Sequence, residues 1–286
     1  MPSLSATRST AGVRHDDMLS FPNCKINLGL RILRRREDGF HELETVFCPL
    51  AIKDALETIR SETLSFTSTG LPIPGDPSAN LCLKAWHLLR SDFPDLPAVD
   101  IHLHKNIPIG AGLGGGSSDG AFMLRLLDRQ FRLGLTADKL MSYAAQLGSD
   151  CPFFILNKPC LAGGRGEKLE PIDLDLSGYR IALVDPGIHV GTAWAFSQCT
   201  PTEEGKSIRG IIAAPVDTWK GQLVNDFEAP VCRAHPELKK IKEKLYQAGA
   251  IYASMTGSGS GFFGIFAKEN LPSPALTADL PGFQLT

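Results

Sequence analysis

The stretch IPIGAGLGGGSSDGAFMLRLL, residues 107 to 127, decides the fold. Five glycines lie within positions 110 to 116, two serines follow, and apolar residues then recur at three- and four-residue spacing. This pattern predicts a loop followed by a helix that begins near Ser117 or Ser118. Glycines let another group approach the main chain, and the free N–H groups at a helix start attract anions. The stretch therefore predicts a phosphate-binding loop rather than a flexible Gly/Ser linker.

Residues that the stretch lacks exclude one class of phosphate-binding loop and disfavour another. Gly110 to Gly115 fit G-x-x-x-x-G, but Gly116 stands where a Walker loop requires lysine, which excludes that class. A G-x-G-x-x-G dinucleotide loop also fits and remains the alternative. It requires a buried parallel strand before the loop and an acidic residue ending a second strand about 20 residues later. VDIHLH alternates like a half-exposed strand, and Asp138 lies in a predicted helix, so this alternative is disfavoured.

Composition and charge restrict the class of protein. The chain has 286 residues, 43% of them hydrophobic, and a net charge of −2. Its pI is near 6.4, so no global basic field favours nucleic acid as a partner. Seven scattered cysteines without a C-x-x-C pair are typical of a reduced, cytoplasmic protein. No apolar run approaches the length of a membrane span, so we expect no membrane partner.

Strand and helix patterns are interleaved, which predicts an α+β fold in two domains, 18–170 and 171–286. Residues 1–17 are rich in small and polar residues and lack the apolar segment of a secretory signal, so we expect a disordered extension or an upstream start. The predicted strands lie at 19–33, 40–50, 62–70, 99–108, twice within 152–172, and at 251–257 and 261–267. The predicted helices lie at 81–93 after an Asn80 cap, and at 136–148, 191–199, 217–228 and 235–250.

Three further stretches contain residues with chemical potential: KINLGL with Lys25, LGSDCPFF with Asp150, and SMTGSGSGFFG with Gly257. Each also has an ordinary structural interpretation. Lys25 fits an edge charge, Asp150 a turn before proline, and the glycines a tight hairpin. His102 and His104 share a strand face but lack a third ligand, so we assign no metal ligands.

Taken together, KINLGL, PIGAGLGGGSSDGA and SMTGSGSGFFG resemble the three signatures of the GHMP kinase superfamily, over nearly everything after Met18. The stretches DGFHELETVF, SANL, LGSDCPFF and VNDFE are similar to the branch that phosphorylates diphosphocytidyl methylerythritol in non-mevalonate isoprenoid synthesis. The resemblance implies an N-terminal domain like ribosomal protein S5 domain 2 and a ferredoxin-like C-terminal domain. It also implies ATP and Mg²⁺, a small-molecule acceptor, and a monomer or weak homodimer.

The resemblance implies that the glycine loop and the following helix hold the triphosphate of ATP, with Ser117 or Ser118 near Mg²⁺. Asn80 is expected to contact the adenine, and Lys105 either to add positive charge beside the loop or to touch the adenine. The residues implied for ATP are Asn80, Lys105, Pro108, Gly110, Gly112, Leu113, Gly114, Gly115, Gly116, Ser117 and Ser118.

The same resemblance implies that Asp150 accepts or orients the proton of the acceptor hydroxyl and that Lys25 stabilises the developing alkoxide. Phe40 stands where the branch commonly has tyrosine, and its ring is expected to stack on cytosine. The other residues implied for the acceptor are Asn27, His41 at the base edge, Thr192, Phe196 on the second face of the base, and Gly257. A non-catalytic nucleic-acid-binding module is a third interpretation, which the acidic balance disfavours.

Overall fold

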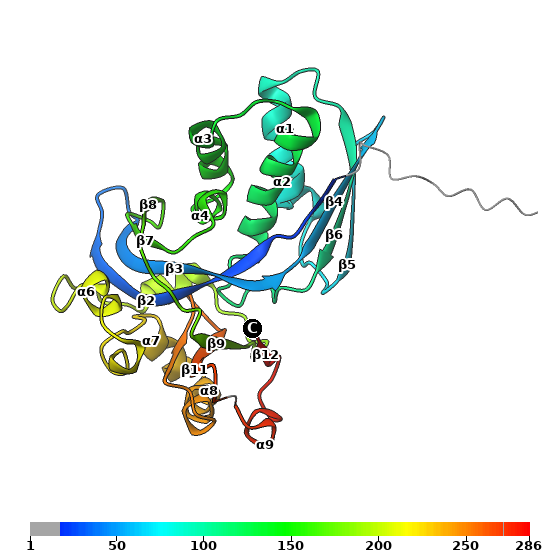
Figure 1. The fold of residues 1–286 in the computed structure, drawn as a ribbon. Helices are drawn as coiled ribbons and strands as arrows, with labels where there is room; N and C mark the ends of the chain where they lie inside the picture. The colour runs from blue at the N-terminus through cyan, green and yellow to red at the C-terminus, as the bar shows by residue number, and fades with distance from the viewer. Residues whose placement is uncertain (1–17, 271) are drawn as a thin grey trace, which may run out of the picture.

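The computed structural model describes residues 18–270 and 272–286, so the expected extension at 1–17 lies outside the described residues. Strands form three four-stranded sheets, and helices cover them in two groups (Figure 1). The long strands β2 and β3 cross the middle of the molecule between these groups. The fold therefore contains both helices and sheets, as the interleaved sequence pattern predicts.

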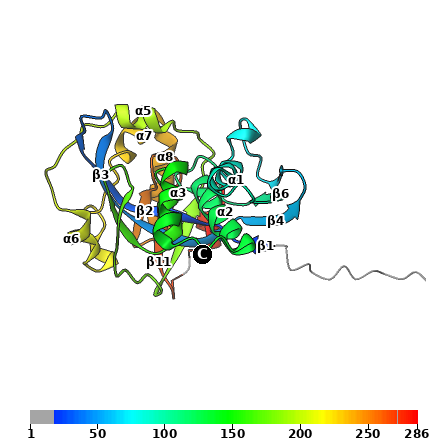
Figure 2. The same ribbon diagram turned by 90° about the horizontal axis from the view of Figure 1, so that it is seen from above.

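The upper part holds a mixed sheet in the order β1-β4-β6-β5. The strand before the glycine loop, β6, is antiparallel to β4 and parallel to β5, unlike the parallel sheet of a dinucleotide fold. Figure 2 shows α1, α2 and α3 side by side, and these helices pack on one another. The elements are β1 Met18–Ser20, β4 Ala55–Ser61, β5 Ser65–Gly70, β6 Ala98–Lys105, η1 Pro77–Ala79, α1 Leu81–Asp92, α2 Gly115–Phe131, α3 Ala137–Leu147 and α4 Cys151–Leu156.

The middle sheet positions the site. Its order is β2-β3-β7-β8, with β2 Asn23–Arg35, β3 His41–Lys53, β7 Cys160–Gly163 and β8 Lys168–Pro171. In β2, Ile26 and Leu28 pack in a core that includes Ile181 and Trp219 from the C-terminal half. Successive side chains of a strand point to opposite faces. The alternating polar residues Lys25 and Asn27, both almost fully buried, therefore face away from that core.

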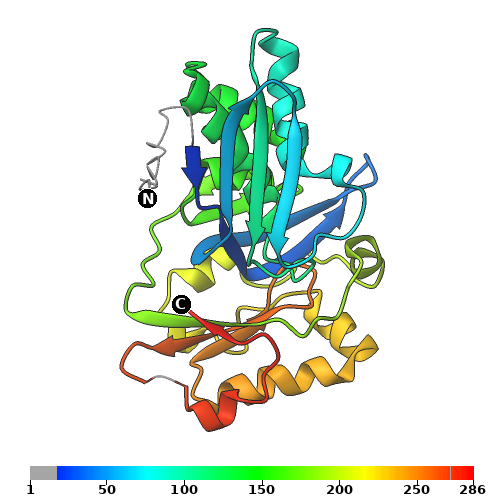
Figure 3. The same ribbon diagram turned by 90° about the vertical axis from the view of Figure 1, so that its right-hand side faces the viewer.

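The lower part is an antiparallel sheet in the order β10-β11-β9-β12, with α8 packed against β10 and β11. In Figure 3 the orange α8 lies below this sheet. The remaining elements are β9 Tyr179–Val184, α5 Thr192–Ser197, α6 Ile208–Ile212, η2 Val216–Thr218, α7 Glu228–Ala234, α8 Pro236–Gln247, β10 Tyr252–Met255, β11 Phe262–Ala267, α9 Pro274–Thr277 and β12 Gln284–Leu285. Because one core joins this part to β2, the domain boundary near residue 170 stays a prediction.

Several predicted elements are confirmed. The Asn80 side chain caps α1 by accepting a 2.8 Å hydrogen bond from the Cys82 N–H. The helix after the glycine loop is present, although it begins at Gly115 rather than near Ser117 or Ser118. The single strand predicted at 19–33 is divided, since Pro22 lies between β1 and β2 and lacks the N–H that a strand ladder uses.

The helix predicted at 217–228 is wrong. The structure has only the turn η2 there, and α7 begins at Glu228. The Leu30 N–H donates to the Val224 carbonyl at 2.9 Å, and the Asp226 N–H donates to the Leu30 carbonyl at 2.9 Å. The segment therefore pairs with β2 through one isolated parallel bridge between Leu30 and Asn225. The sequence analysis also missed β4, whose seven residues mix apolar and polar side chains, and α4, a six-residue apolar run too short to show helical spacing.

Among residues 18–270 and 272–286, no helix is both long and apolar enough to cross a membrane.

Candidate active site

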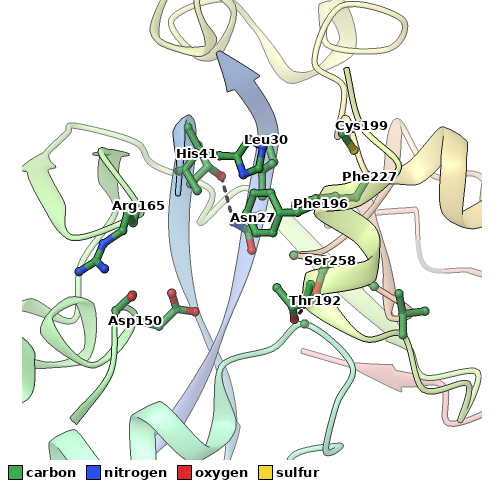
Figure 4. Close-up of a pocket in the computed structure, with 18 of the residues that line it drawn as sticks. Asn27, Leu30, His41, Asp150, Arg165, Thr192, Phe196, Cys199, Phe227 and Ser258 are labelled. Carbon is green, nitrogen blue, oxygen red and sulfur yellow. Dashed lines mark hydrogen bonds between the residues drawn. The ribbon is translucent and has the colours of Figure 1, made fainter. Parts of the chain in front are cut away.

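A cleft of about 1190 Å³ opens between the middle sheet, the glycine loop and the lower part of the molecule (Figure 4). It gathers residues from segments that lie far apart in the sequence. The predicted site residues that line it are Lys25, Asn27, Phe40, His41, Gly110, Gly112, Gly114, Asp150, Thr192, Phe196 and Gly257. The cleft is therefore the meeting place of the three signature stretches.

Lys25 and Asp150 form the ionic centre of this cleft. The Lys25 Nζ lies 3.5 Å from the Asp150 Oδ2 and donates a 2.6 Å hydrogen bond to the Asn27 Oδ1. It also lies 4.8 Å from the centroid of the Phe47 ring. The lysine side chain is 5% exposed, whereas the Asp150 side chain is 32% exposed. The carboxylate can therefore meet a ligand while the ammonium group supports it from below.

Asn27 is held from several sides. Its Nδ2 donates to the Thr45 Oγ1 at 3.0 Å, and the Thr45 hydroxyl donates to the Gly29 carbonyl at 2.5 Å. The Asn27 N–H donates to the Thr256 Oγ1 at 3.0 Å. These bonds fix the orientation of the amide, and hence of the oxygen that Lys25 contacts, before any ligand arrives.

The glycines of the first loop serve two purposes. A Cβ at Gly112 would lie 2.2 Å from the Thr256 carbonyl oxygen, and Gly112 has φ +76°. A Cβ at Gly261 would lie 2.4 Å from the Ala111 carbonyl oxygen. The second and third signature stretches are therefore packed backbone against backbone. By contrast, a Cβ at Gly116 would meet nothing within 4 Å. Gly112 is therefore needed for packing within the protein, whereas Gly116 leaves space that a ligand could occupy.

The start of α2 provides free backbone N–H groups beside the loop, as every helix start does. Ser117 is half-buried there, while the Ser118 hydroxyl is enclosed and has no hydrogen-bond partner within the described part of the chain. The described residues contain no group of three or more His, Cys, Asp or Glu side chains able to hold a metal. Mg²⁺ needs no such cage, because it commonly binds one or two protein groups together with substrate phosphates. Ser117 fits that sparse mode, whereas the enclosed Ser118 presents its hydroxyl less well.

Lys105, expected to contact the nucleotide, is buried beneath the loop instead. Its Nζ forms ion pairs with Asp54 and with Asp119, the latter at 2.8 Å, and the side chain is 3% exposed. Asp54 also accepts hydrogen bonds from the N–H groups of Asn106 and Ile107, at 2.6 and 2.8 Å. Burial raises the pKa of Asp119 to about 8. In this structure Lys105 therefore joins the end of β6 to α2 and to the connection between β3 and β4, and it does not line the cleft.

Among the other residues expected at ATP, Pro108 and Leu113 are buried in the loop. The side-chain oxygen of Asn80 accepts the hydrogen bond that caps α1. None of the three lines the cleft. His102 and His104, to which no metal was assigned, both hydrogen-bond the Thr69 hydroxyl.

The aromatic residues expected at cytosine all line the cleft but do not form an open slot. The rings of His41 and Phe196 stack directly, with centroids 4.9 Å apart and planes 15° apart. A base cannot lie between these two rings in this conformation. Phe40 is 53% exposed, and the Arg165 guanidinium carbon lies 4.5 Å from its ring centroid. Near them the Thr192 hydroxyl lies 3.0 Å from the Ser258 hydroxyl.

The sequence analysis missed Arg35, Arg165 and His189, which also line the cleft. A signal existed for Arg165, because GGRGE places it between two glycines, which is typical of a tight turn. The role of VNDFE was also missed. The Asn225 Nδ2 donates to the carbonyls of Met255 and Gly257, at 2.9 and 2.8 Å, and so holds the third signature stretch in place.

Comparison with known proteins identifies the class of this site. The family described as "GHMP kinases N terminal domain" matches residues 80–158, and "GHMP kinases C terminal" matches residues 217–278. A protein of Azobacteroides pseudotrichonymphae named 4-diphosphocytidyl-2-C-methyl-D-erythritol kinase is 50% identical over 259 residues, 89% of this chain and 96% of that protein. A protein of the same name from Bacteroides fragilis is 51% identical, over 88% of this chain and 93% of that protein.

Solved structures agree with these relatives. A crystal structure of 4-(cytidine 5'-diphospho)-2C-methyl-D-erythritol kinase matches with a TM-score of 0.79 and 32% identity, over 94% of this chain and 98% of that one. A homoserine kinase from Cytophaga hutchinsonii matches with a TM-score of 0.64 and 13% identity, over 100% of this chain and 96% of that one, and so shares the fold. The expected two-domain fold is therefore confirmed.

Proposed function

Because the chain belongs to the GHMP kinase family and, within it, to the 4-diphosphocytidyl-2-C-methyl-D-erythritol kinases, we propose that its cleft moves the γ-phosphoryl group of ATP to the acceptor's 2-hydroxyl. The product would serve isoprenoid precursor synthesis by the non-mevalonate route. The observation that carries the proposal is the Lys25–Asp150 pair in the cleft that the first glycine loop also lines.

Phosphoryl transfer asks the protein mainly for positioning and charge neutralisation. Asp150 is the group that would orient the acceptor hydroxyl and accept its proton, because its carboxylate is about one-third exposed and lines the cleft. The Lys25 ammonium group would stabilise the negative charge that develops on that oxygen. Asn27, fixed by Thr45, would keep the ammonium group in place and contact the acceptor.

The triphosphate of ATP would lie over the first glycine loop, with its charge towards the start of α2. The open space at Gly116 supports this placement, as do the free N–H groups of the first helical turn. Ser117 would hold the accompanying Mg²⁺, which supplies additional neutralisation of phosphate charge when bound. Asn80 stays our proposed contact for the adenine.

The cytidine end of the acceptor would lie at the opposite end of the cleft, near Phe40 and His41. A base stacked on an aromatic ring contributes about 1–3 kcal/mol, and this contribution does not need a tyrosine hydroxyl. For Phe196 to cover the second face of the base, its ring must first separate from His41. We therefore propose that α5, which carries Phe196, moves relative to β3 when the acceptor binds.

The decisive experiment gives the purified protein Mg-ATP and diphosphocytidyl methylerythritol, with galactose, homoserine and mevalonate as rival acceptors. We expect transfer to the diphosphocytidyl compound and at least 100-fold lower kcat/KM for each rival, because those lack the base and diphosphate. Transfer to a rival at equal or greater efficiency would contradict the proposed acceptor. Tight NADH binding without ATP binding would instead support the dinucleotide interpretation.

We also propose that the protein works in the cytoplasm, as a monomer or weak homodimer, without a nucleic-acid or membrane partner. The dispersed, unpaired cysteines and the small net negative charge support this setting. A salt-sensitive complex with RNA in a filter-binding assay would speak against it.

A further inference from the structure

We propose that Arg165 binds the diphosphate of the acceptor and so determines the preference for a nucleoside diphosphate over a nucleoside. This inference rests on the proposed function, because it assigns one part of that substrate to one side chain. The sequence signatures do not include Arg165, and the structure places it on the wall of the cleft.

Arg165 stands at the tip of the turn between β7 and β8. Gly164 and Gly166 on either side have φ +68° and +109°, a backbone conformation that strongly favours glycine. The Gly166 N–H donates to the Gly163 carbonyl at 3.0 Å, and the Arg165 N–H donates to the Glu167 Oε2 at 2.6 Å. The turn is thus closed by its own bonds and presents the arginine side chain outward.

The position of this arginine matches the middle of the substrate. Its guanidinium carbon lies 4.5 Å from the Phe40 ring centroid, at the end of the cleft proposed for cytosine. A Cβ on the next residue, Gly166, would lie 3.9 Å from the Asp150 Oδ1, at the end proposed for the reacting hydroxyl. Figure 4 shows Arg165 and Asp150 on the same wall, opposite Thr192 and Ser258. In the acceptor, the ribose and the diphosphate lie between the base and the reacting alcohol, and the diphosphate is the charged part that a guanidinium group can bind.

The charge of the cleft also fits a diphosphate. Among the residues that the structure describes, the charged side chains lining the cleft are those of Lys25, Arg35 and Arg165 and the carboxylate of Asp150, a formal excess of two positive charges with histidine neutral. The nearby Asp38 takes hydrogen bonds from Arg36, at 2.9 Å or longer. A guanidinium group can bind a phosphate through two parallel hydrogen bonds, which gives both affinity and direction.

The test measures binding of CDP and of cytidine, each by calorimetry, with a non-hydrolysable ATP analogue saturating the first glycine loop. The proteins are the unaltered chain, Arg165→Ala, Arg165→Lys and, as the matched control, Arg180→Ala, an exposed arginine on β9. A hydrogen-bonded charge contributes about 1.5–3 kcal/mol, which corresponds to about 10- to 100-fold in affinity. We expect Arg165→Ala to weaken CDP binding by that factor and cytidine binding by less than twofold, with Arg165→Lys between the two.

The comparison of the two ligands separates the proposed role from a structural one. If Arg165 only supports the Phe40 ring, CDP and cytidine lose affinity equally, and the proposal is overturned. It is also overturned if the unaltered chain binds CDP no more tightly than cytidine, or if Arg165→Ala leaves CDP binding unchanged. Failure of the proposed function would appear separately, as a lack of phosphoryl transfer to the acceptor by the unaltered chain.

Discussion

Two lysines of this chain contact adjacent glycines of the same loop and are surrounded differently. A Cβ at Gly114 would lie 3.1 Å from the Lys25 Cε, and a Cβ at Gly115 would lie 3.4 Å from the Lys105 Nζ. Lys25 faces Asp150, which is about one-third exposed, whereas Lys105 lies between the fully enclosed Asp54 and Asp119. We infer that exposure of the carboxylate, rather than presence of an ion pair, distinguishes the proposed catalytic pair from the buried cluster that supports the fold.

The largest effect is expected where the carboxylate is exposed. Asp150→Asn removes the proposed proton acceptor, and general base catalysis contributes about 100- to 10,000-fold. We expect kcat to fall by that factor, while ATP affinity stays within a few-fold and the denaturation midpoint hardly changes. Steady-state kinetics and ATP-analogue binding measure this, with Asp95→Asn, on an exposed loop, as the control. Full turnover by Asp150→Asn would remove the carboxylate from the mechanism.

In the buried cluster of Lys105, Asp54 and Asp119, a substitution should lower stability much more than turnover. Asp54→Asn removes a charge that Lys105 and two backbone N–H groups use, and breaking a buried pair costs about 3–5 kcal/mol. We expect the free energy of unfolding in urea to fall by this amount, with kcat of the remaining folded enzyme within about threefold. A strong decrease in kcat for Asp54→Asn at unchanged stability would contradict this comparison, because it would show that the Lys105 cluster takes part in catalysis.

The smallest effects sharpen the same contrast within the glycine loop. Gly112→Ala places a methyl group against the Thr256 carbonyl at positive φ, so we expect a loss of about 1–3 kcal/mol in unfolding free energy. Gly116→Ala meets no protein atom, and stability should stay within about 0.5 kcal/mol. If the triphosphate occupies that space, Gly116→Ala should instead raise the KM for ATP. Equal destabilisation by both substitutions would show that the two glycines are not used differently.

The sequence predicted the glycine loop and the helix after it because their pattern is local. It mispredicted 217–228 because Trp219, Leu223 and Phe227 recur at helical spacing, whereas hydrogen bonds to Leu30, remote in sequence, determine the backbone there. The place of Lys105 could not be predicted for the same reason, since its partner Asp54 lies 51 residues away.

The candidate site was predicted by its signature stretches, and the structure brings most of their residues to one cleft. Arg165 was missed because no signature contains it. The direct contact of His41 with Phe196 could not be predicted either, because it depends on how α5 sits against β3.

The alternation of side chains along β2 links the packing of the core to the lining of the cleft. Ile26 and Leu28 enter the shared core, while Lys25 and Asn27 on the other face serve the cleft. Residues 25–28 pair with β3 without a register shift, so a one-residue shift within this segment would exchange the two faces and bury charge in the core. An insertion or deletion there would disturb the core and the cleft together, so the spacing of Lys25 and Asn27 is coupled to the ability to fold.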